Sequence, residues 1–285
     1  MSIDYPALLT RYFPDARQAY DWRDCILYAL GLGLGSDPLS ACELSYVYES
    51  GLRVLPTMAT VMGQPGFWIG EADTGIDSTN VVHGEQSLIV HAPLSPAGVL
   101  IGRTRIIDVV DRGTGRGAIV RVQTDLHDEQ TGRPQSTQIS TLFCRGDGGF
   151  GGPPPAPRSI AVLPSAPPDT SIERVIPPQA ALIYRLSGDL NPLHAEPIAA
   201  RRAGFSRPIL HGLATYGAAA FGLLQACEKG ADERLKSLSC RFTAPVFPGE
   251  TLRTDIWRRE GRMLFRSTVV ERDVIVLDGG QAVFN

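Results

Sequence analysis

One segment of the chain, residues 146–169, most limits how the rest can fold. Its sequence, GDGGFGGPPPAPRSIAVLPSAPPD, clusters Gly and Pro, which interrupt both helices and strands. About 145 residues precede this segment and about 115 follow it, and either length is enough for a compact domain. We therefore predict two structural halves, residues 1–145 and 170–285, joined by a linker at 146–169.

Both halves show the same order of elements, a helical stretch followed by strands. In the C-terminal half, hydrophobic periodicity predicts helices at 197–203 and 213–229, the second ending before Gly230, and strands at 238–243, 251–260 and 263–272. In the N-terminal half, it predicts a helix at 22–32 and strands at 86–91, 99–110, 118–127 and 138–145. A helix followed by antiparallel strands indicates an α+β fold in which a curved sheet wraps a helix.

Glycines recur along the longest predicted helix, at Gly212, Gly217 and Gly222. Without a Cβ atom, they would let strands approach the helix backbone closely. The alternative is that they only lower helix stability, as glycine does in a helix interior.

Composition excludes several classes of partner and compartment. The chain has 27 Lys and Arg against 30 Asp and Glu, a net charge of −3, which argues against a nucleic acid or an anionic membrane surface as the main partner. The longest weakly polar stretch, 213–227, is shorter than the roughly 20 residues of a membrane span, and the N-terminus does not resemble a secretory signal. The 5 cysteines form no C-x-x-C pair, so neither a disulfide framework nor a zinc site is indicated and we expect a reducing compartment.

The segment Tyr184 to His194, YRLSGDLNPLH, carries the strongest chemical signal. Gly188 and Pro192 interrupt any helix there, so the polar side chains should lie on a structured loop. Those side chains are Ser187, Asp189, Asn191 and His194. An Asp followed five positions later by a His, with no third ligand nearby in the sequence, suits general acid-base catalysis better than metal binding.

We therefore predict that Asp189 and His194 act on a water molecule, without a metal or another cofactor. Covalent catalysis has little support, because the chain has no G-x-S-x-G motif and no Cys with an obvious His partner in the sequence. The alternative reading of His194 alone is a surface or core histidine without a catalytic role.

Gly212, in RPILHGLATYG, immediately precedes the long predicted helix. Helix N-termini present N–H groups without intrahelical partners and a partial positive charge, which suit the oxygen of a polarised thioester or an enolate. The alternative is a helix start with no role in binding.

Three segments of the C-terminal half, YRLSGDLNPLH, AGFSRPILHGLATYG and RFTAPVFPGETL, resemble the (R)-specific type 2 enoyl-CoA hydratases of the MaoC-like group. Further segments, YALGLG at 28–33, YESG at 48–51, VVHGEQ at 81–86 and GGFGG at 148–152, resemble the hydratase region of peroxisomal multifunctional enzyme type 2. The resemblance covers about residues 20 to 272.

This resemblance implies a double hotdog fold, in which two curved antiparallel sheets each wrap a long central helix. It also implies a hydro-lyase of fatty acid β-oxidation that adds water reversibly and syn to a trans-2-enoyl-CoA, giving the (3R)-3-hydroxyacyl-CoA. Only the C-terminal half keeps the S-G-D-x-N-P-x-H motif, so we expect one active site per chain, with the N-terminal half shaping an acyl tunnel. We further expect a free-standing cytoplasmic enzyme that binds acyl-CoA, does not bind membranes and forms a homodimer.

Site residues follow from the resemblance position by position. His194 is assigned as base and Asp189 as acid, although a coupled pair need not have separable roles. Asn191 would orient the water or the Asp189 carboxyl group, and the Gly212 amide would donate to the thioester oxygen. The resemblance also implies substrate-binding roles for His83, Gly84, Arg112, Leu190 and Phe242, and supporting roles for Tyr28 and Glu49.

Three other activities remain as alternatives. A dehydratase acting on acyl carrier protein uses the same chemistry on a different carrier. An acyl-CoA thioesterase shares the hotdog fold but generally lacks the Asp-x-Asn-Pro-x-His arrangement. A non-catalytic acyl-CoA-binding protein would not need Asp189 and His194 together.

Overall fold

The computed structural model of the chain describes residues 2–152, 161–227 and 235–284. Its strands form one continuous 10-stranded sheet in the order β1-β3-β4-β5-β2-β7-β10-β9-β8-β6, with antiparallel neighbours. The strands are β1 (Ala16–Tyr20), β2 (Val81–Val90), β3 (Gly98–Asp111), β4 (Ala118–Asp128), β5 (Pro134–Cys144), β6 (Thr170–Val175), β7 (Leu235–Phe242), β8 (Thr251–Arg259), β9 (Arg262–Val269) and β10 (Val274–Phe284). The predicted strands are all present, whereas β1, β6 and β10 were not predicted.

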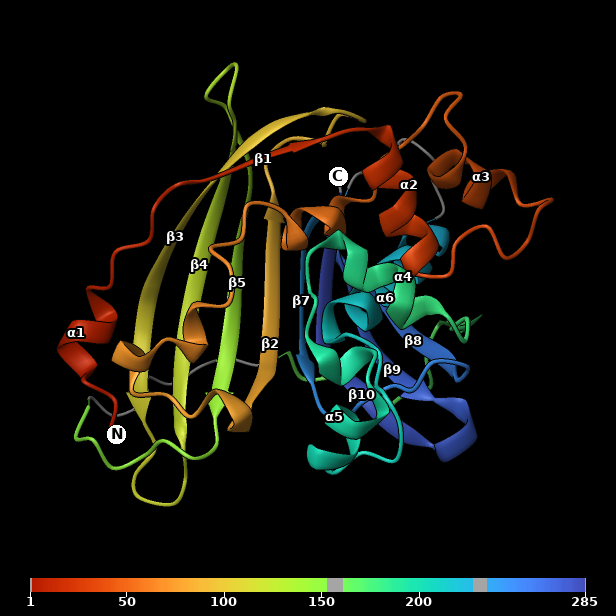
Figure 1. Cartoon of the computed structure of the whole chain (residues 1–285). Coiled ribbons are helices and arrows are strands. Elements are labelled where there is room, and N and C mark those ends of the chain that lie inside the picture. Colours follow the sequence, from red (N-terminus) through yellow and green to blue (C-terminus); the bar gives the residue numbers. More distant parts are fainter. Residues whose placement is uncertain (1, 153–160, 228–234, 285) are drawn as a thin grey trace.

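The two halves meet where β2 pairs with β7, with Leu88 opposite Leu238 and Gln86 opposite Cys240. Leu88, Leu238 and Cys240 are buried in one core that also takes in residues of both halves. The halves are therefore two curved parts of a single sheet rather than two separate sheets (Figure 1). The predicted boundaries of the linker at 146–169 stay predictions, and part of it, 153–160, lies outside the described residues.

Helix α6 (Gly212–Gln225) lies against the sheet of the C-terminal half (Figure 1). It is buried continuously from Ala214 to Leu223, as expected of a helix that is apolar on all sides. The helix ends earlier than predicted, with Ala226 as its C-cap, and the predicted cap Gly230 lies outside the described residues.

Close approach to α6 comes from a helix as well as from strands. A Cβ atom on Gly217 would lie 2.8 Å from the side chain of Leu32, which follows α2 (Trp22–Gly31). A Cβ atom on Gly222 would lie 3.6 Å from Ile172 of β6, an ordinary contact. The small residues of α6 therefore accommodate α2, which the sequence analysis did not anticipate.

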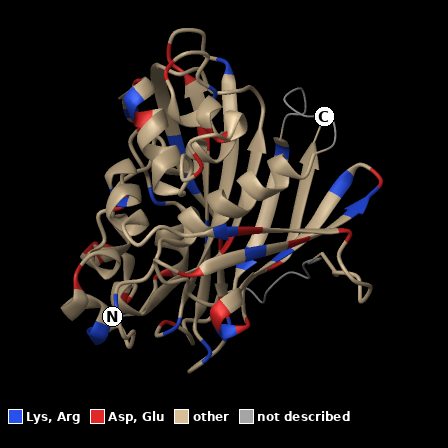
Figure 2. Ribbon diagram, turned by 90° about the vertical axis from the view of Figure 1, so that its right-hand side faces the viewer, with Lys and Arg blue, Asp and Glu red and all other residues tan. Residues whose placement is uncertain are grey.

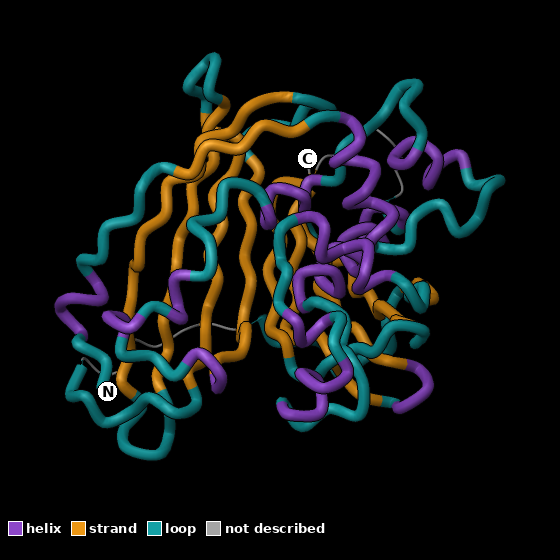
Figure 3. Tube along the Cα trace, in the orientation of Figure 1, coloured by secondary structure: helices purple, strands orange, loops and turns teal. Residues whose placement is uncertain are grey.

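The N-terminal half differs from the expectation that each half wraps a long central helix. Its predicted helix, α2, packs against α4 (Ala180–Tyr184) of the other half. The helices come this close because Gly31 has no side chain: a Cβ atom on Gly31 would lie only 2.9 Å from the Cα atom of Tyr184. Figure 3 shows that the sheet of the N-terminal half faces loops and short helical turns instead. These are α1 (Tyr5–Leu9) and the 3-10 helices η1 (Pro56–Val61), η2 (Trp68–Gly70), η3 (Ala72–Thr74) and η4 (Ser78–Asn80).

The remaining helical elements lie beside α2, around α6 and before β10. They are α3 (Ala41–Val47), η5 (Arg185–Ser187), η6 (Pro192–His194), α5 (Pro197–Arg202) and η8 (Val270–Arg272). None of the described helices is long and apolar enough to cross a membrane.

A buried ion pair ties α3 to strand β6 across the two halves. Arg174 and Glu43 are separated by 2.8 Å, with 9% and 7% of their side chains exposed. The second carboxylate oxygen of Glu43 accepts the backbone N–H of Gly35, and the Arg174 guanidinium lies 4.7 Å from the ring centroid of Phe221. This cluster therefore fixes the N-terminal helices on the C-terminal half.

Charges of both signs are interspersed along the sheet (Figure 2). Arg121 pairs with Asp108 on neighbouring strands, and Arg241 and Arg266 both reach Asp278. These pairs bring opposite charges together on neighbouring strands.

Candidate active site

The predicted catalytic segment forms a loop between two helical turns. Helix α4 ends at Tyr184, η5 follows, and Gly188 then adopts a φ of +125°, which favours glycine. The chain resumes a helical turn only at Pro192, the first residue of η6. The prediction that this segment cannot be one helix is confirmed.

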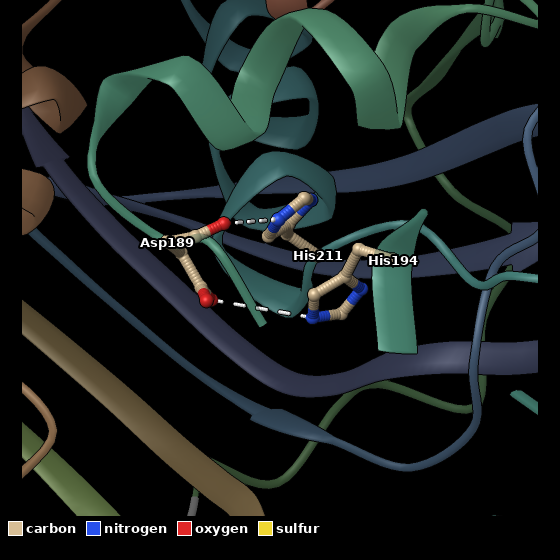
Figure 4. A group of neighbouring side chains, drawn as sticks. All are labelled: Asp189, His194 and His211. Atoms are coloured by element: carbon tan, nitrogen blue, oxygen red, sulfur yellow. Dashed lines mark hydrogen bonds and ion pairs between the residues drawn. The ribbon is translucent and has the colours of Figure 1, made fainter. Parts of the chain in front are cut away.

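Asp189 and His194 lie close together with their functional groups directed at each other (Figure 4). The Nε2 atom of His194 is 4.0 Å from Oδ2 of Asp189, and the carboxylate is half exposed whereas the imidazole is buried. Nδ1 of His194 lies 2.9 Å from the carbonyl oxygen of Ile209. A carbonyl only accepts hydrogen bonds, so the proton of the neutral ring is on Nδ1 and the lone pair of Nε2 faces Asp189.

Burial sets the charge state of His194. It lowers the pKa of the ring from its ordinary value of 6.5, the nearby Arg185 lowers it further, and the hydrogen bond to Ile209 and the charge of Asp189 only partly oppose this. A neutral imidazole with a free Nε2 lone pair can accept a proton, which is what a general base does.

A second histidine, His211, completes the cluster and was missed by the sequence analysis (Figure 4). Its ring stacks on His194 with centroids 3.7 Å apart and an interplanar angle of 25°. Its Nε2 lies 3.1 Å from the backbone carbonyl of Asp189. The contact could not be predicted because His211 is 22 positions from Asp189 in the sequence. His211 does, however, directly precede Gly212, which the sequence analysis identified.

Asn191 and Leu190 occupy the same loop. The Asn191 side chain accepts the N–H of Leu193 and so caps η6, and its own backbone N–H donates to the Asp189 carboxylate. The Leu190 side chain is exposed, and its carbonyl accepts a hydrogen bond from Arg185, which helps to hold the loop. Asn191 thus orients Asp189 through its main chain, and a role of its side chain toward water stays a prediction.

Gly212 is the first residue of α6, with His211 as the N-cap. The N–H groups of the first helical turn have no acceptor within the helix. A Cβ atom on Gly212 would lie 3.4 Å from the Phe242 ring, so Phe242 packs directly beside the helix start. The predicted amide donor therefore follows the residue that contacts both Asp189 and His194.

Phe242 links this site to a cavity of about 290 Å³. Gly84, Arg112 and Phe242, which were predicted to bind substrate, all line it, together with Arg241. His83, also predicted to bind substrate, packs on Phe242 with centroids 4.8 Å apart. Burial lowers the pKa of His83 to about 4, so its ring is neutral.

The two predicted supporting residues lie in different surroundings. Tyr28 is fully buried and packs on Tyr184 with centroids 5.6 Å apart, and Tyr184 in turn packs on His211 at 5.0 Å. Glu49 is exposed on the bend after α3, whereas Glu43 on α3 itself pairs with Arg174 of the C-terminal half. The supporting role of Glu49 stays a prediction.

Asp189, His194 and His211 are also the residues that could hold a metal ion, because their ligand atoms lie within 4.8 Å of one another. The sequence argument against a metal assumed that no third ligand was near, and the structure supplies one. His194 and His211 each use one ring nitrogen for a backbone carbonyl and keep the other ring nitrogen. The expectation that the pair acts without a metal stays a prediction.

Two family models together match most of the chain. Residues 160–279 match the MaoC like domain, and residues 18–146 match the MFE-2 hydratase 2 N-terminal domain. The matched parts contain strands β2 to β9 in full.

Two curated relatives match over nearly their full length. The chain is 40% identical to 3-hydroxyacyl-thioester dehydratase Y of Mycobacterium tuberculosis, covering 92% of each chain. It is 36% identical to the peroxisomal enoyl-CoA hydratase 2 of Arabidopsis thaliana, covering 95% of this chain and 93% of the relative.

Solved structures agree on the fold. The MaoC-like dehydratase from Phytophthora capsici matches with a TM-score of 0.86 at 32% identity, covering 99% of this chain and 98% of that one. A Mycobacterium tuberculosis protein described as having a double hotdog fold matches with a TM-score of 0.56 at 15% identity, covering 99% of this chain and 98% of that one, which concerns the fold alone. The predicted α+β double hotdog is confirmed, except that one half lacks the long central helix within the described residues.

Proposed function

The chain belongs to the MaoC-like hydratase 2 family, and from that premise we propose that it is an (R)-specific 2-enoyl-CoA hydratase. The observation that carries the proposal is the buried His194 imidazole with its Nε2 directed at the Asp189 carboxylate, 4.0 Å away. This gap is too long for a direct hydrogen bond and suits a water molecule that both groups contact.

Hydration then proceeds by two proton transfers on one face of the substrate. The pair enters the reaction with one proton, carried by the Asp189 carboxyl group. Neutral His194 takes a proton from the water as the water oxygen bonds to the β carbon, and the protonated Asp189 carboxyl group gives its proton to the α carbon. A proton passing from His194 to Asp189 restores the starting state. Because both groups act from the same side, addition is syn, and the roles within this coupled pair are interchangeable.

The Gly212 amide stabilises the negative charge that develops on the thioester oxygen. A donor aimed at such an oxygen is worth about 10²- to 10³-fold in rate. Its support is position, because Gly212 begins α6 directly after His211 and beside Phe242.

We assign the cavity beside Phe242 to the CoA part of the substrate. Arg112 and Arg241 both line it, and guanidinium groups recognise phosphate well. The Arg112 guanidinium also lies 5.1 Å from the ring centroid of Phe143, which limits its movement. The acyl chain would run toward the N-terminal half, where no described helix matches α6 in length.

The first experiment measures hydration of trans-2-enoyl-CoAs of different chain lengths from the loss of conjugated thioester absorbance, with the product chirality determined. We expect a (3R) product. Asp189→Asn and His194→Gln should each lower kcat by roughly 10²- to 10⁴-fold, because each removes one of the two proton-transfer groups. His91→Gln, at an exposed histidine, is the matched control and should leave kcat unchanged.

Two outcomes would contradict the proposal. One is a (3S) product. The other is near-normal turnover in both catalytic variants while the proteins stay folded. Hydrolysis of the thioester in place of hydration would instead support the thioesterase alternative.

A second experiment separates CoA from acyl carrier protein as the carrier. Arg112→Ala should raise KM for crotonyl-CoA about 10-fold and leave KM for crotonyl-pantetheine, which lacks the nucleotide phosphates, unchanged. Arg116→Ala is the control in the same turn, because Arg116 does not line the cavity. A strong preference of the unmodified protein for the acyl carrier protein substrate would favour the dehydratase alternative.

The proposal also includes the absence of a cofactor, a homodimeric state and a cytoplasmic location. Water and the two proton-transfer groups suffice for the reaction, so treatment with a metal chelator should leave the activity intact. Sedimentation should give twice the chain mass. Buried free thiols at Cys25, Cys144 and Cys240 suit a reducing compartment, which cell fractionation would test.

A further inference from the structure

His211 touches both members of the proposed catalytic pair, the main chain of Asp189 and the ring of His194. Its Nε2 lies 3.1 Å from the carbonyl oxygen of Asp189, and its ring stacks 3.7 Å from the ring of His194. It is also the N-cap of α6, so the next residue is Gly212. One residue thus connects three separate parts of the site, two through its side chain and Gly212 through its main chain.

We infer that His211 is a positioning residue for the hydration reaction, holding the Asp189 main chain by a hydrogen bond and the His194 ring by stacking. The inference rests on the proposed function. Misplacement of a catalytic group by about 1 Å can cost about 100-fold in rate, so a side chain that fixes both groups has a measurable effect without touching substrate.

The hydrogen-bonding pattern defines which form of His211 does this. The Asp189 carbonyl can only accept, so Nε2 carries the proton, while Nδ1 is buried and has no hydrogen-bond partner among the described residues. Burial and the neighbouring His194 lower the pKa of His211 to about 4, which keeps the ring neutral. A neutral ring can stack on His194 without placing a like charge beside it when His194 accepts a proton.

The groups that face His211 come from each element around it. Asp189 lies on the loop, His194 on η6, Arg185 on η5 and Tyr184 on α4. Asp189 favours the charged form of His211, whereas His194 and Arg185 oppose it. The unpaired Nδ1 lowers stability, because a buried acceptor without a donor has lost its hydrogen bond to water, so a purely structural role would be served better by an apolar ring.

Two variants separate the two contacts. His211→Phe keeps the stacked ring and removes the hydrogen bond to Asp189, whereas His211→Gln keeps a donor near the Nε2 position and removes the ring. We expect each to lower kcat about 10-fold and His211→Ala about 100-fold, with KM for crotonyl-CoA within about 3-fold of the unmodified enzyme. His211→Phe should lose no thermal stability, because it also removes the unpaired nitrogen.

The pH profile provides a readout that a structural role would not move. His211→Ala admits water beside His194, which weakens the burial that lowers the pKa of His194. The acid limb of kcat/KM should therefore shift to higher pH in His211→Ala and stay in place in His211→Phe. Equal kcat in His211→Phe, His211→Gln and the unmodified enzyme would overturn the inference.

A measurement on the unmodified protein covers the case in which a variant fails to fold. Nitrogen NMR of histidine-labelled protein should show His211 neutral and protonated at Nε2 from pH 5 to pH 9. A ring that titrates in this range, or carries its proton on Nδ1, would contradict the inference. This result is independent of hydratase activity, so failure of the proposed function and failure of the positioning role are distinguishable.

Discussion

The His194 imidazole and the Asp189 carboxylate meet water very differently. The imidazole is buried against the Ile209 carbonyl and the His211 ring, whereas half of the Asp189 side chain is exposed. Loss of solvent disfavours the charged imidazolium, so the environment of His194 selects the form that accepts a proton.

This environment predicts the pH dependence of hydration. His194 acts as a base only when neutral, so kcat/KM should fall as the pH falls through its pKa, which burial holds below 6.5. We expect the acid limb of the profile for crotonyl-CoA below pH 6.5 and absent from the residual activity of His194→Gln. If the midpoint of the acid limb lay above pH 6.5 in the unmodified enzyme, a group other than His194 would control the loss of activity.

For single residues, the local sequence predicted the site where the catalytic side chains and the residues that break the helix lie in the same segment. Gly188 and Pro192 break the helix around Asp189 and His194, so their position on one loop could be predicted. His211 is 22 positions from Asp189 and reaches it only because α6 packs beside the loop. The contact could not be predicted from residue spacing in the motif, because His211 lies outside the segment that carries the motif.

Among the elements, α6 carries the clearest link between local structure and catalysis. Its first residue, Gly212, follows His211, whose φ of −60° and ψ of 138° are extended. Proline tolerates the first helical position and requires an extended residue before it, so this helix start can lose one N–H group without losing its geometry.

Gly212→Pro therefore tests the proposed amide donor. Proline removes the N–H group, and we expect kcat for crotonyl-CoA to fall by about 10²- to 10³-fold. Gly212→Ala is the matched control, because it keeps the N–H group and its Cβ atom would lie at an ordinary 3.4 Å from Phe242. Equal rates in the two variants, with unchanged helical circular dichroism, would exclude the amide as the donor.

The three strands that were not predicted have sequences that only weakly indicate a strand. Strand β1 has only 5 residues, β6 is an edge strand directly after the predicted linker, and β10 contains Gly279 and Gly280 at an irregularity in its pairing. Helix α2 was predicted in the right place, but its partner was not. Its packing on α4 depends on the close approach at Gly31, a contact between the two halves.

The whole molecule depends on contacts that join the halves, of which the Glu43–Arg174 pair is the most buried ion pair described. Glu43→Gln leaves the Arg174 charge buried without its counter-charge, so we expect a loss of about 3 kcal/mol in the free energy of unfolding. Glu129→Gln breaks the exposed pair with Arg17, where 40% and 60% of the side chains are accessible, and should cost far less than Glu43→Gln. Urea denaturation compares the two, and similar losses would mean that the Glu43–Arg174 pair does not stabilise the contact between the halves.

Acid sensitivity of the folded chain follows from its buried neutral histidines. Burial lowers the pKa of His83 and of His211 to about 4, while the same rings in the unfolded chain titrate near 6.5. Between these values the unfolded state binds protons that the folded state does not, so the free energy of unfolding should fall as the pH falls from 6.5 toward 4, by up to about 3 kcal/mol per ring. Above pH 6.5 neither state binds these protons, and the contribution of the rings is constant.

Urea denaturation at pH 7.5, 6.0 and 5.0 isolates this effect, because most carboxylates titrate at lower pH. His83→Phe removes one buried titrating ring and should reduce the stability lost between pH 6.5 and pH 5 by up to about 2 kcal/mol. His91→Gln, at an exposed ring, should leave that loss unchanged. If His83→Phe and the unmodified protein lost the same stability over this interval, His83 would titrate alike in both states and its ring would not be held neutral by burial.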